Sequence, residues 1–127
     1  MAVGSTAIIP KMLTRQPLIS SHLDLSFVSG VFIAPIVEEI VFRGVILDRL
    51  GTRYRFAIAN VLTSVLFVSI HMVGWSFQDR LMENLTMPVG GALSIFLLSL
   101  VFGFVAHKSR SVAASTLTHM LNNLCAA

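Results

Sequence analysis

Two carboxylates and a guanidinium lie within an otherwise apolar stretch of this 127-residue chain, residues 34–44. Ionised groups are costly in an apolar segment, so they usually occur where a cavity, a partner or a reaction requires them. On a helix, Glu39 and Arg43 would lie one turn apart on the same face. Glu38 would point about 100° away from its neighbour. We therefore predict that Glu39 and Arg43 form a buried ion pair and that Glu38 faces a site.

Two further polar positions follow at helical spacing, Phe67 with His71 and His119 with Asn123. Carboxylates, imidazoles and amides are groups that activate water and stabilise negative charge in acyl transfer. Measured at ~1.5 Å per residue from the nearest basic turn, Glu38 and these histidines lie ~15–28 Å along their helices. Polar groups from separate segments that reach a similar depth predict a shared site.

The composition indicates how these groups are held. Apolar residues make up 55% of the chain and charged residues 12%, about half the charged content of a soluble domain. Short polar turns separate the apolar segments, so neighbouring segments should run antiparallel. We predict an all-α membrane bundle of about four transmembrane helices. The predicted helices cover residues 25–50, 56–75, 87–106 and 111–127.

The remaining features limit the possible domain organisation and the possible kinds of site. Residues 1–24 lack apolar periodicity and are expected to form a flexible or interfacial segment, and residues 25–127 the helical domain. The net charge of +3 comes from basic residues between apolar runs, which suits membrane anchoring and gives no nucleic-acid footprint. The single cysteine, Cys125, excludes an intrachain disulfide. Sequence motifs of zincins, serine hydrolases and phosphate-binding loops are absent.

Three short motifs carry a resemblance to a known family. The chain has Glu-Glu-x-x-x-Arg at residues 38–43, Phe-x-x-x-His at 67–71 and His-x-x-x-Asn at 119–123. Their order and spacing resemble those of the CAAX prenyl endopeptidase and bacteriocin-processing (CPBP, also called Abi) family of intramembrane proteases. Three such motifs on separate apolar segments are much more specific than one.

The resemblance implies a helical membrane endopeptidase, originally assigned to the metalloproteases, with roles for particular residues. Glu38 would activate the water and His71 would help to hold it. His119 and Asn123 would stabilise the oxyanion or complete a metal site. The resemblance gives supporting roles to Glu39, Arg43 and Phe67.

The metal requirement stays open at this point. Glu38, His71 and His119 make a reasonable set of ligands for a divalent metal such as Zn²⁺. Asn123 is a poor zinc ligand, however, and the same groups can work on a glutamate-activated water without metal. We favour the glutamate-activated water and keep zinc as the alternative.

The expected partners are membrane lipid and a peptide or protein substrate, either a prenylated peptide or a leader peptide. The chain is expected to be a multi-pass protein of a prokaryotic plasma membrane. Few residues precede the first motif, so the chain is expected to be a minimal form of the family, a fragment, or a homo-oligomer whose self-association closes the cavity. The alternative function is a non-catalytic membrane protein, for bacteriocin immunity or as a scaffold, that keeps Glu38, His71, His119 and Asn123 as a polar core.

Overall fold

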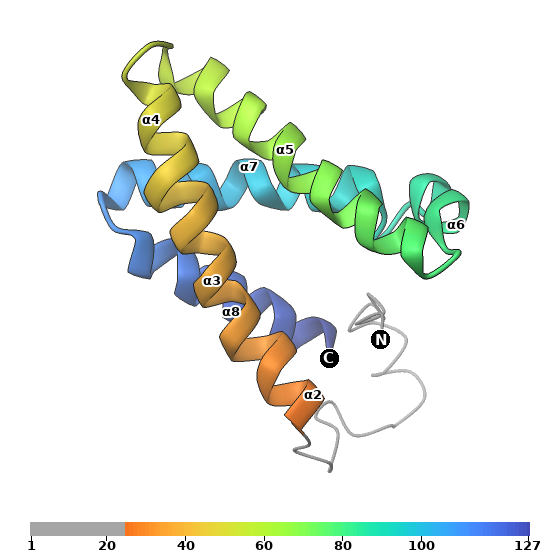
Figure 1. The fold of residues 1–127 in the computed structure, drawn as a ribbon. Coiled ribbons are helices and arrows are strands. Elements are labelled where there is room, and N and C mark those ends of the chain that lie inside the picture. Colours follow the sequence, from red (N-terminus) through yellow and green to blue (C-terminus); the bar gives the residue numbers. More distant parts are fainter. Residues whose placement is uncertain (1–24) are drawn as a thin grey trace.

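The computed structural model describes residues 25–127, and this part of the chain consists of helices joined by short connections, with no strand. The first helix runs without interruption from Leu25 to Gly51 (Figure 1). It alternates between α-helical and π-helical segments: α2 (Leu25–Val28), η1 (Ser29–Ile33), α3 (Ala34–Glu39), η2 (Ile40–Leu47) and α4 (Asp48–Gly51). The predicted N-terminal segment, residues 1–24, lies outside the described residues.

Four more helices follow, and the all-α prediction is confirmed. Their bounds are α5 (Phe56–Phe77), α6 (Leu81–Thr86), α7 (Ala92–Ser109) and α8 (Val112–Ala126). Of the described helices, Leu25–Gly51, α5 and α7 are long and apolar enough to cross a membrane. The predicted fourth span does form a helix, α8, but its 15 residues extend only about 22 Å, less than the ~30 Å of a bilayer core.

The connection predicted as a polar loop after α5 contains a short helix instead. Two residues after α5, Asp79 lies in the left-handed region, at φ 55°, which lets the Asp79 and Arg80 N–H groups bond back to the last turn of α5. α6 then starts at once, and Asn84 donates its side-chain amide to the Arg80 carbonyl at 2.9 Å. The sequence analysis did not predict α6, because this short helix is stabilised by hydrogen bonds at the turn and has no helical repeat of apolar residues.

In the described helices, many of the buried residues are polar and many large apolar residues are exposed. Glu39, Thr63, Ser64, Ser99 and Ser115 are fully buried, while many large aliphatic side chains are exposed. This distribution is the reverse of a soluble core. It fits helices surrounded by lipid, where small and polar residues mediate helix–helix contact.

α5 and α7 pack closely because a glycine meets an asparagine. Gly103 of α7 lies against Asn60 of α5, and Asn60 donates its amide to the Leu100 carbonyl at 3.0 Å. A Cβ at position 103 would collide with the Asn60 side-chain oxygen. The absence of a side chain at Gly103 therefore sets how near the two helices lie.

Replacing Gly103 by alanine tests this contact. The added methyl should displace the Asn60 amide, break its bond to Leu100 and lower the free energy of unfolding in detergent micelles by about 1–3 kcal/mol. Gly51→Ala is the matched control, because a Cβ there meets no atom within 4 Å and alanine favours the helix. Equal stability of the two variants would contradict the close approach of α5 and α7.

Candidate active site

The predicted ion pair between Glu39 and Arg43 is observed, and it lies at the centre of the bundle. Arg43 Nη1 donates to Glu39 Oε1 at 2.9 Å, and both side chains are fully buried. Arg43 Nη2 donates to the carbonyl and to the hydroxyl of Ser99 on α7, at 2.8 and 2.7 Å. One guanidinium thus neutralises a buried carboxylate on its own helix and ties that helix to α7.

Two aromatic rings complete the surroundings of Arg43. Its guanidinium carbon lies 4.9 Å from the ring centroid of Phe67 and 5.5 Å from that of Phe102. Aromatic faces attract a cation most strongly where water is excluded. The predicted supporting residue Phe67 therefore contacts the ion pair, and sequence reasoning missed Phe102 and Ser99. The Ser99-x-x-x-Gly103 spacing of small residues in α7 is the signal that could have indicated this face.

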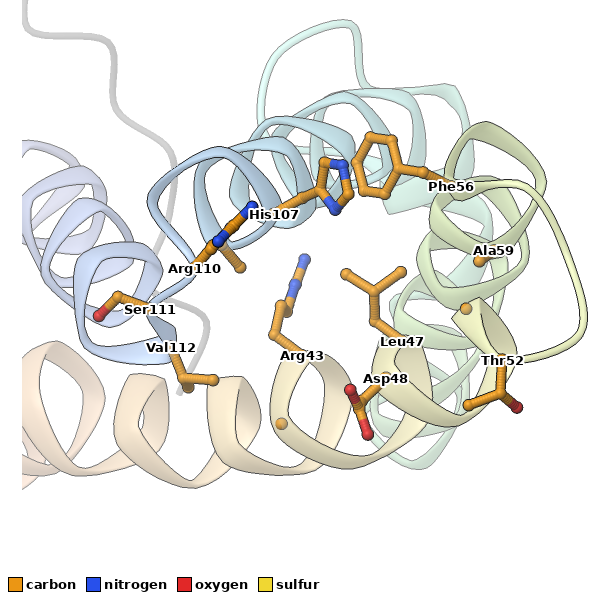
Figure 2. A pocket seen from close by; sticks show the side chains of 13 residues that line it. Arg43, Leu47, Asp48, Thr52, Phe56, Ala59, His107, Arg110, Ser111 and Val112 are labelled. Carbon is orange, nitrogen blue, oxygen red and sulfur yellow. The ribbon is translucent and has the colours of Figure 1, made fainter.

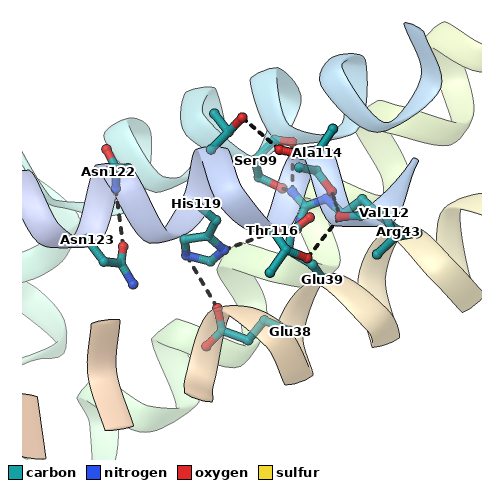
Figure 3. Close-up of polar contacts among 12 residues, drawn as sticks. Glu38, Glu39, Arg43, Ser99, Val112, Ala114, Thr116, His119, Asn122 and Asn123 are labelled. Atoms are coloured by element: carbon teal, nitrogen blue, oxygen red, sulfur yellow. Dashed lines mark hydrogen bonds and ion pairs between the residues drawn. The ribbon is translucent and has the colours of Figure 1, made fainter. Parts of the chain in front are cut away.

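His119 lies between the two glutamates (Figure 3). Its Nδ1 is 3.0 Å from Glu39 Oε1, and its Nε2 is 3.7 Å from Glu38 Oε2. Because a carboxylate only accepts, Nδ1 carries the hydrogen and donates it to Glu39. The ring stacks on Phe102 at 4.5 Å between centroids, with 21° between the planes. Glu39 therefore fixes the orientation of His119, and its Nε2 faces Glu38.

His71 is held by a bond within its own helix. Its Nδ1 lies 2.8 Å from the Phe67 carbonyl, one turn earlier in α5. A carbonyl only accepts, so Nδ1 is the donor, and in the neutral ring Nε2 keeps a lone pair. The imidazole also packs against the rings of Phe67 and Trp75. Phe67 thus positions both the ring and the tautomer of His71.

Asn123 is anchored to the first helix. Its Nδ2 donates to the Gly30 carbonyl at 3.0 Å, and its Oδ1 accepts from Asn122 at 3.3 Å (Figure 3). Gly30 belongs to the π-helical segment η1, and Asn123 lies one turn beyond His119 on α8. α8 therefore contacts the first helix at two levels, through His119 and through Asn123.

Glu38, His71, His119 and Asn123 line one cavity of about 480 Å³. Part of the Glu38 side chain is accessible, at 30%, whereas that of Glu39 is not, at 0%. The predicted division between a buried structural glutamate and a glutamate facing a cavity is thus observed. The structure brings the four predicted catalytic residues to one cavity, and their catalytic roles stay a prediction.

A second cavity, of about 600 Å³, lies at the basic end of the bundle and does not contain these four residues (Figure 2). Residues of both basic turns line it, including Thr52 and Arg110, so both turns lie at the same end of the bundle. Arg43 and its neighbour Gly44 also line this cavity, whereas Glu38 lines the other. We place the candidate site in the smaller cavity because it holds the groups that can do acid–base chemistry.

One charged pair lies outside the membrane-spanning helices, next to the candidate site. Arg80 lines the site cavity and donates from Nε and Nη2 to the Glu83 carboxylate, at 3.1 and 3.3 Å. The hydrogen bond from Arg80 lowers the pKa of Glu83, and the same bond raises the pKa of Arg80. Both groups therefore stay ionised around neutral pH.

The fit of a metal ion can be judged from the donor atoms. The free Nε2 atoms of His71 and His119 and the carboxylate of Glu38 are chemically suited to zinc, and both histidines have Nδ1 held by an oxygen, as metal-binding histidines usually do. Among residues 25–127, however, no three His, Cys, Asp or Glu side chains are close enough to share one ion. The arrangement therefore does not form a metal set, and we derive no step through a metal.

The fold and the site define an all-helical membrane protein with an acid–base cluster between its helices. A family model described as type II CAAX prenyl endopeptidase Rce1-like matches residues 21–125. The chain therefore belongs to this Rce1-like family, which confirms the family resemblance of its three motifs. It is a CAAX protease-like integral membrane protein of a family that acts on peptides. No curated protein and no solved structure matches the chain.

Replacing Arg43 by methionine tests the role of the ion pair in the fold. The substitution leaves the Glu39 carboxylate buried without its cation, so the free energy of unfolding should fall by about 3–5 kcal/mol. Chemical unfolding in mixed micelles measures the change. Glu83→Gln is the control, since it breaks an exposed pair and should leave the unfolding midpoint unchanged. If both variants unfold at the wild-type midpoint, the ion pair does not hold the bundle together.

Proposed function

We propose that the chain is an intramembrane endopeptidase that uses a water activated by Glu38. The observation that carries the proposal is the position of His119, whose two ring nitrogens face Glu39 at 3.0 Å and Glu38 at 3.7 Å in the wall of the cavity. A base, an oriented imidazole and an amide around one cavity are the groups that peptide hydrolysis needs. A structural core requires only the buried pair, Glu39 with Arg43.

In the first step, Glu38 and His71 hold the attacking water. The Glu38 carboxylate accepts one of its hydrogens, and His71 Nε2, whose lone pair is free, accepts the other. Glu38 then takes its proton while the water oxygen forms a bond to the carbon of the scissile carbonyl. The π electrons of that carbonyl move to its oxygen and produce the oxyanion.

His119 and Asn123 stabilise the oxyanion. His119 Nδ1 already donates to Glu39, so donation from Nε2 requires the doubly protonated ring. Before the proton transfer, the carboxylates of Glu38 and Glu39 balance the positive charges of this ring and of Arg43. Once Glu38 is protonated, the oxyanion replaces its negative charge. Asn123 donates a side-chain N–H. Each donor aimed at an oxyanion in a site without bulk water contributes about 3 kcal/mol.

Collapse of the intermediate completes the reaction. The carbonyl double bond re-forms, the carbon–nitrogen bond breaks, and the departing amine takes the proton that Glu38 received from water. The first products are a carboxylic acid and an amine, and Glu38 is again ionised. The acid then gives its remaining proton to the amine, so the products leave as a carboxylate and an ammonium group. Glu39, Arg43 and Phe67 contribute by holding His119 and His71 in place.

The proposed substrate is a peptide that reaches the site from the membrane, either a prenylated C-terminal peptide or a leader peptide. The membrane location of the helices favours a substrate with a lipid-soluble part. We also propose a prokaryotic plasma membrane as the location and self-association as the way to close the cavity. The peptide substrate rests on the family.

Glu38→Gln separates a protease from a non-catalytic scaffold. Glutamine keeps the size of the side chain but cannot accept a proton, so kcat should fall by about 10³-fold while the unfolding midpoint stays at the wild-type value. The assay uses proteoliposomes and internally quenched peptides that end in a CAAX sequence, with and without a farnesyl group.

Asp48→Asn is the matched control for this experiment. Asp48 is a carboxylate on the same continuous helix, it is exposed, and it lines only the larger cavity. It should keep wild-type turnover. A Glu38→Gln protein as active as Asp48→Asn would contradict the protease proposal, and a wild-type protein that cleaves neither peptide would contradict a CAAX peptide as the substrate.

Metal removal distinguishes the two forms of the mechanism. We expect turnover to survive dialysis against EDTA and 1,10-phenanthroline, because the described side chains do not gather as three ligands around one ion. Elemental analysis of the dialysed enzyme verifies that it holds no metal. If turnover disappears with the chelators and Zn²⁺ alone restores it, the zinc form replaces the glutamate-activated water.

A further inference from the structure

Pro35 lies inside the first helix, where it removes a backbone donor. Proline has no N–H, and its ring crowds the carbonyl of the preceding turn. The segment before it, η1 (Ser29–Ile33), is π-helical, and the Ala34 N–H bonds to the Ser29 carbonyl, five residues back. In that register, the donor to the Gly30 carbonyl would be the N–H of residue 35, which proline lacks.

The Gly30 carbonyl is bonded from another helix instead. Two backbone N–H groups could donate to the Gly30 carbonyl, that of residue 34 in an α-helical turn and that of residue 35 in a π-helical turn. The Ala34 N–H already bonds to Ser29, and Pro35 has no N–H. Backbone carbonyls away from water need a partner, and Asn123 Nδ2 supplies one at 3.0 Å. The proline therefore leaves this carbonyl without a backbone donor in the π register, and Asn123 satisfies it.

These contacts define the orientation of the Asn123 amide. Its oxygen accepts from Asn122 and its nitrogen donates to Gly30. An amide nitrogen has two hydrogens, so one N–H of Asn123 is left over. Gly30 and Asn123 line the same cavity as Glu38, which places this amide at the wall where the substrate carbonyl would bind.

We infer that Pro35 is a positioning residue for Asn123. By keeping backbone donors off the Gly30 carbonyl, Pro35 lets this carbonyl bind one N–H of the amide and leaves the other N–H for the oxyanion. Pro35 contributes no atom to the polar cluster and acts only through Gly30. The inference rests on the proposed role of Asn123 as an oxyanion donor.

Pro35→Ala tests the inference. Alanine restores the N–H, so the Gly30 carbonyl gains a backbone donor in either register: residue 35 in a π turn or Ala34 in an α turn. This backbone donor then competes with Asn123 for the carbonyl and weakens its anchor, and kcat for the quenched farnesylated peptide should fall about 10- to 100-fold, as expected for a displaced catalytic group. The unfolding midpoint should stay the same or rise, because a proline inside a helix is destabilising.

A double-mutant comparison shows whether Pro35 acts through the amide. In an Asn123→Ala background, Pro35→Ala should change kcat less than twofold, since there is no amide left to position. Pro88→Ala, in the connection between α6 and α7, is the control for replacing a proline and should keep wild-type turnover.

A second measurement does not depend on activity. Hydrogen exchange of the ¹⁵N-labelled Asn123 side-chain amide, followed by NMR in micelles, should be slow in the wild-type protein and at least tenfold faster in Pro35→Ala. Unchanged exchange, or an equal loss of kcat with and without Asn123, would overturn the inference. Faster exchange in a protein that cleaves no peptide would instead support the anchoring of Asn123 and contradict the proposed protease.

Discussion

The bundle depends on a carboxylate that is buried in an apolar environment, that of Glu39. Such a group is tolerated only when a cation and further donors compensate it. Arg43 provides the cation from one turn away, and His119 provides a second donor from α8. Because Arg43 also bonds Ser99, this one charge pair connects the first helix to both α7 and α8. The helix contacts that position the residues of the site are therefore also the contacts that stabilise the buried charge.

The same arrangement explains why two adjacent glutamates have different surroundings. Successive residues on a helix point about 100° apart, so Glu39 faces α7 and α8 while Glu38 faces the cavity. His119 contacts both glutamates, one through each ring nitrogen. The structural pair thus sets the position of the imidazole in the candidate site. Substitution of Glu39 should affect stability and chemistry together, whereas substitution of Glu38 should affect chemistry alone.

Helical periodicity was sufficient to predict the main features of the fold and of the buried pair. Polar residues in apolar segments are few, so the spacing between Glu39 and Arg43 and the helical spans could be read directly from the sequence. The partners of Arg43 on α7 were not predicted, because hydropathy varies little around that segment. Only the spacing of the small residues Ser99 and Gly103 marks the face that contacts Arg43. The shorter last helix and the added α6 also depend on caps and turns and not on hydropathy.

The hydrogen bonds within the site could not be predicted from the sequence. The motif spacing placed His119 and Asn123 on one face of α8, but the bond from Asn123 to Gly30 depends on the π-helical register that precedes Pro35. A proline in a helix can be accommodated by a kink, a break or a wider turn, and the sequence does not choose among them. The catalytic roles of Glu38, His71, His119 and Asn123 stay predictions, which the chemistry of the reaction must test.

Single-turnover hydrolysis in H₂¹⁸O tests the central claim most directly, because it identifies the atom that attacks the peptide. If a water held by Glu38 is the nucleophile, one ¹⁸O should appear in the new carboxylate of the product and none in Glu38, as measured by mass spectrometry of the product and of the digested enzyme. An unlabelled product with ¹⁸O in the Glu38 carboxylate would show that the glutamate itself attacks, and would contradict the account.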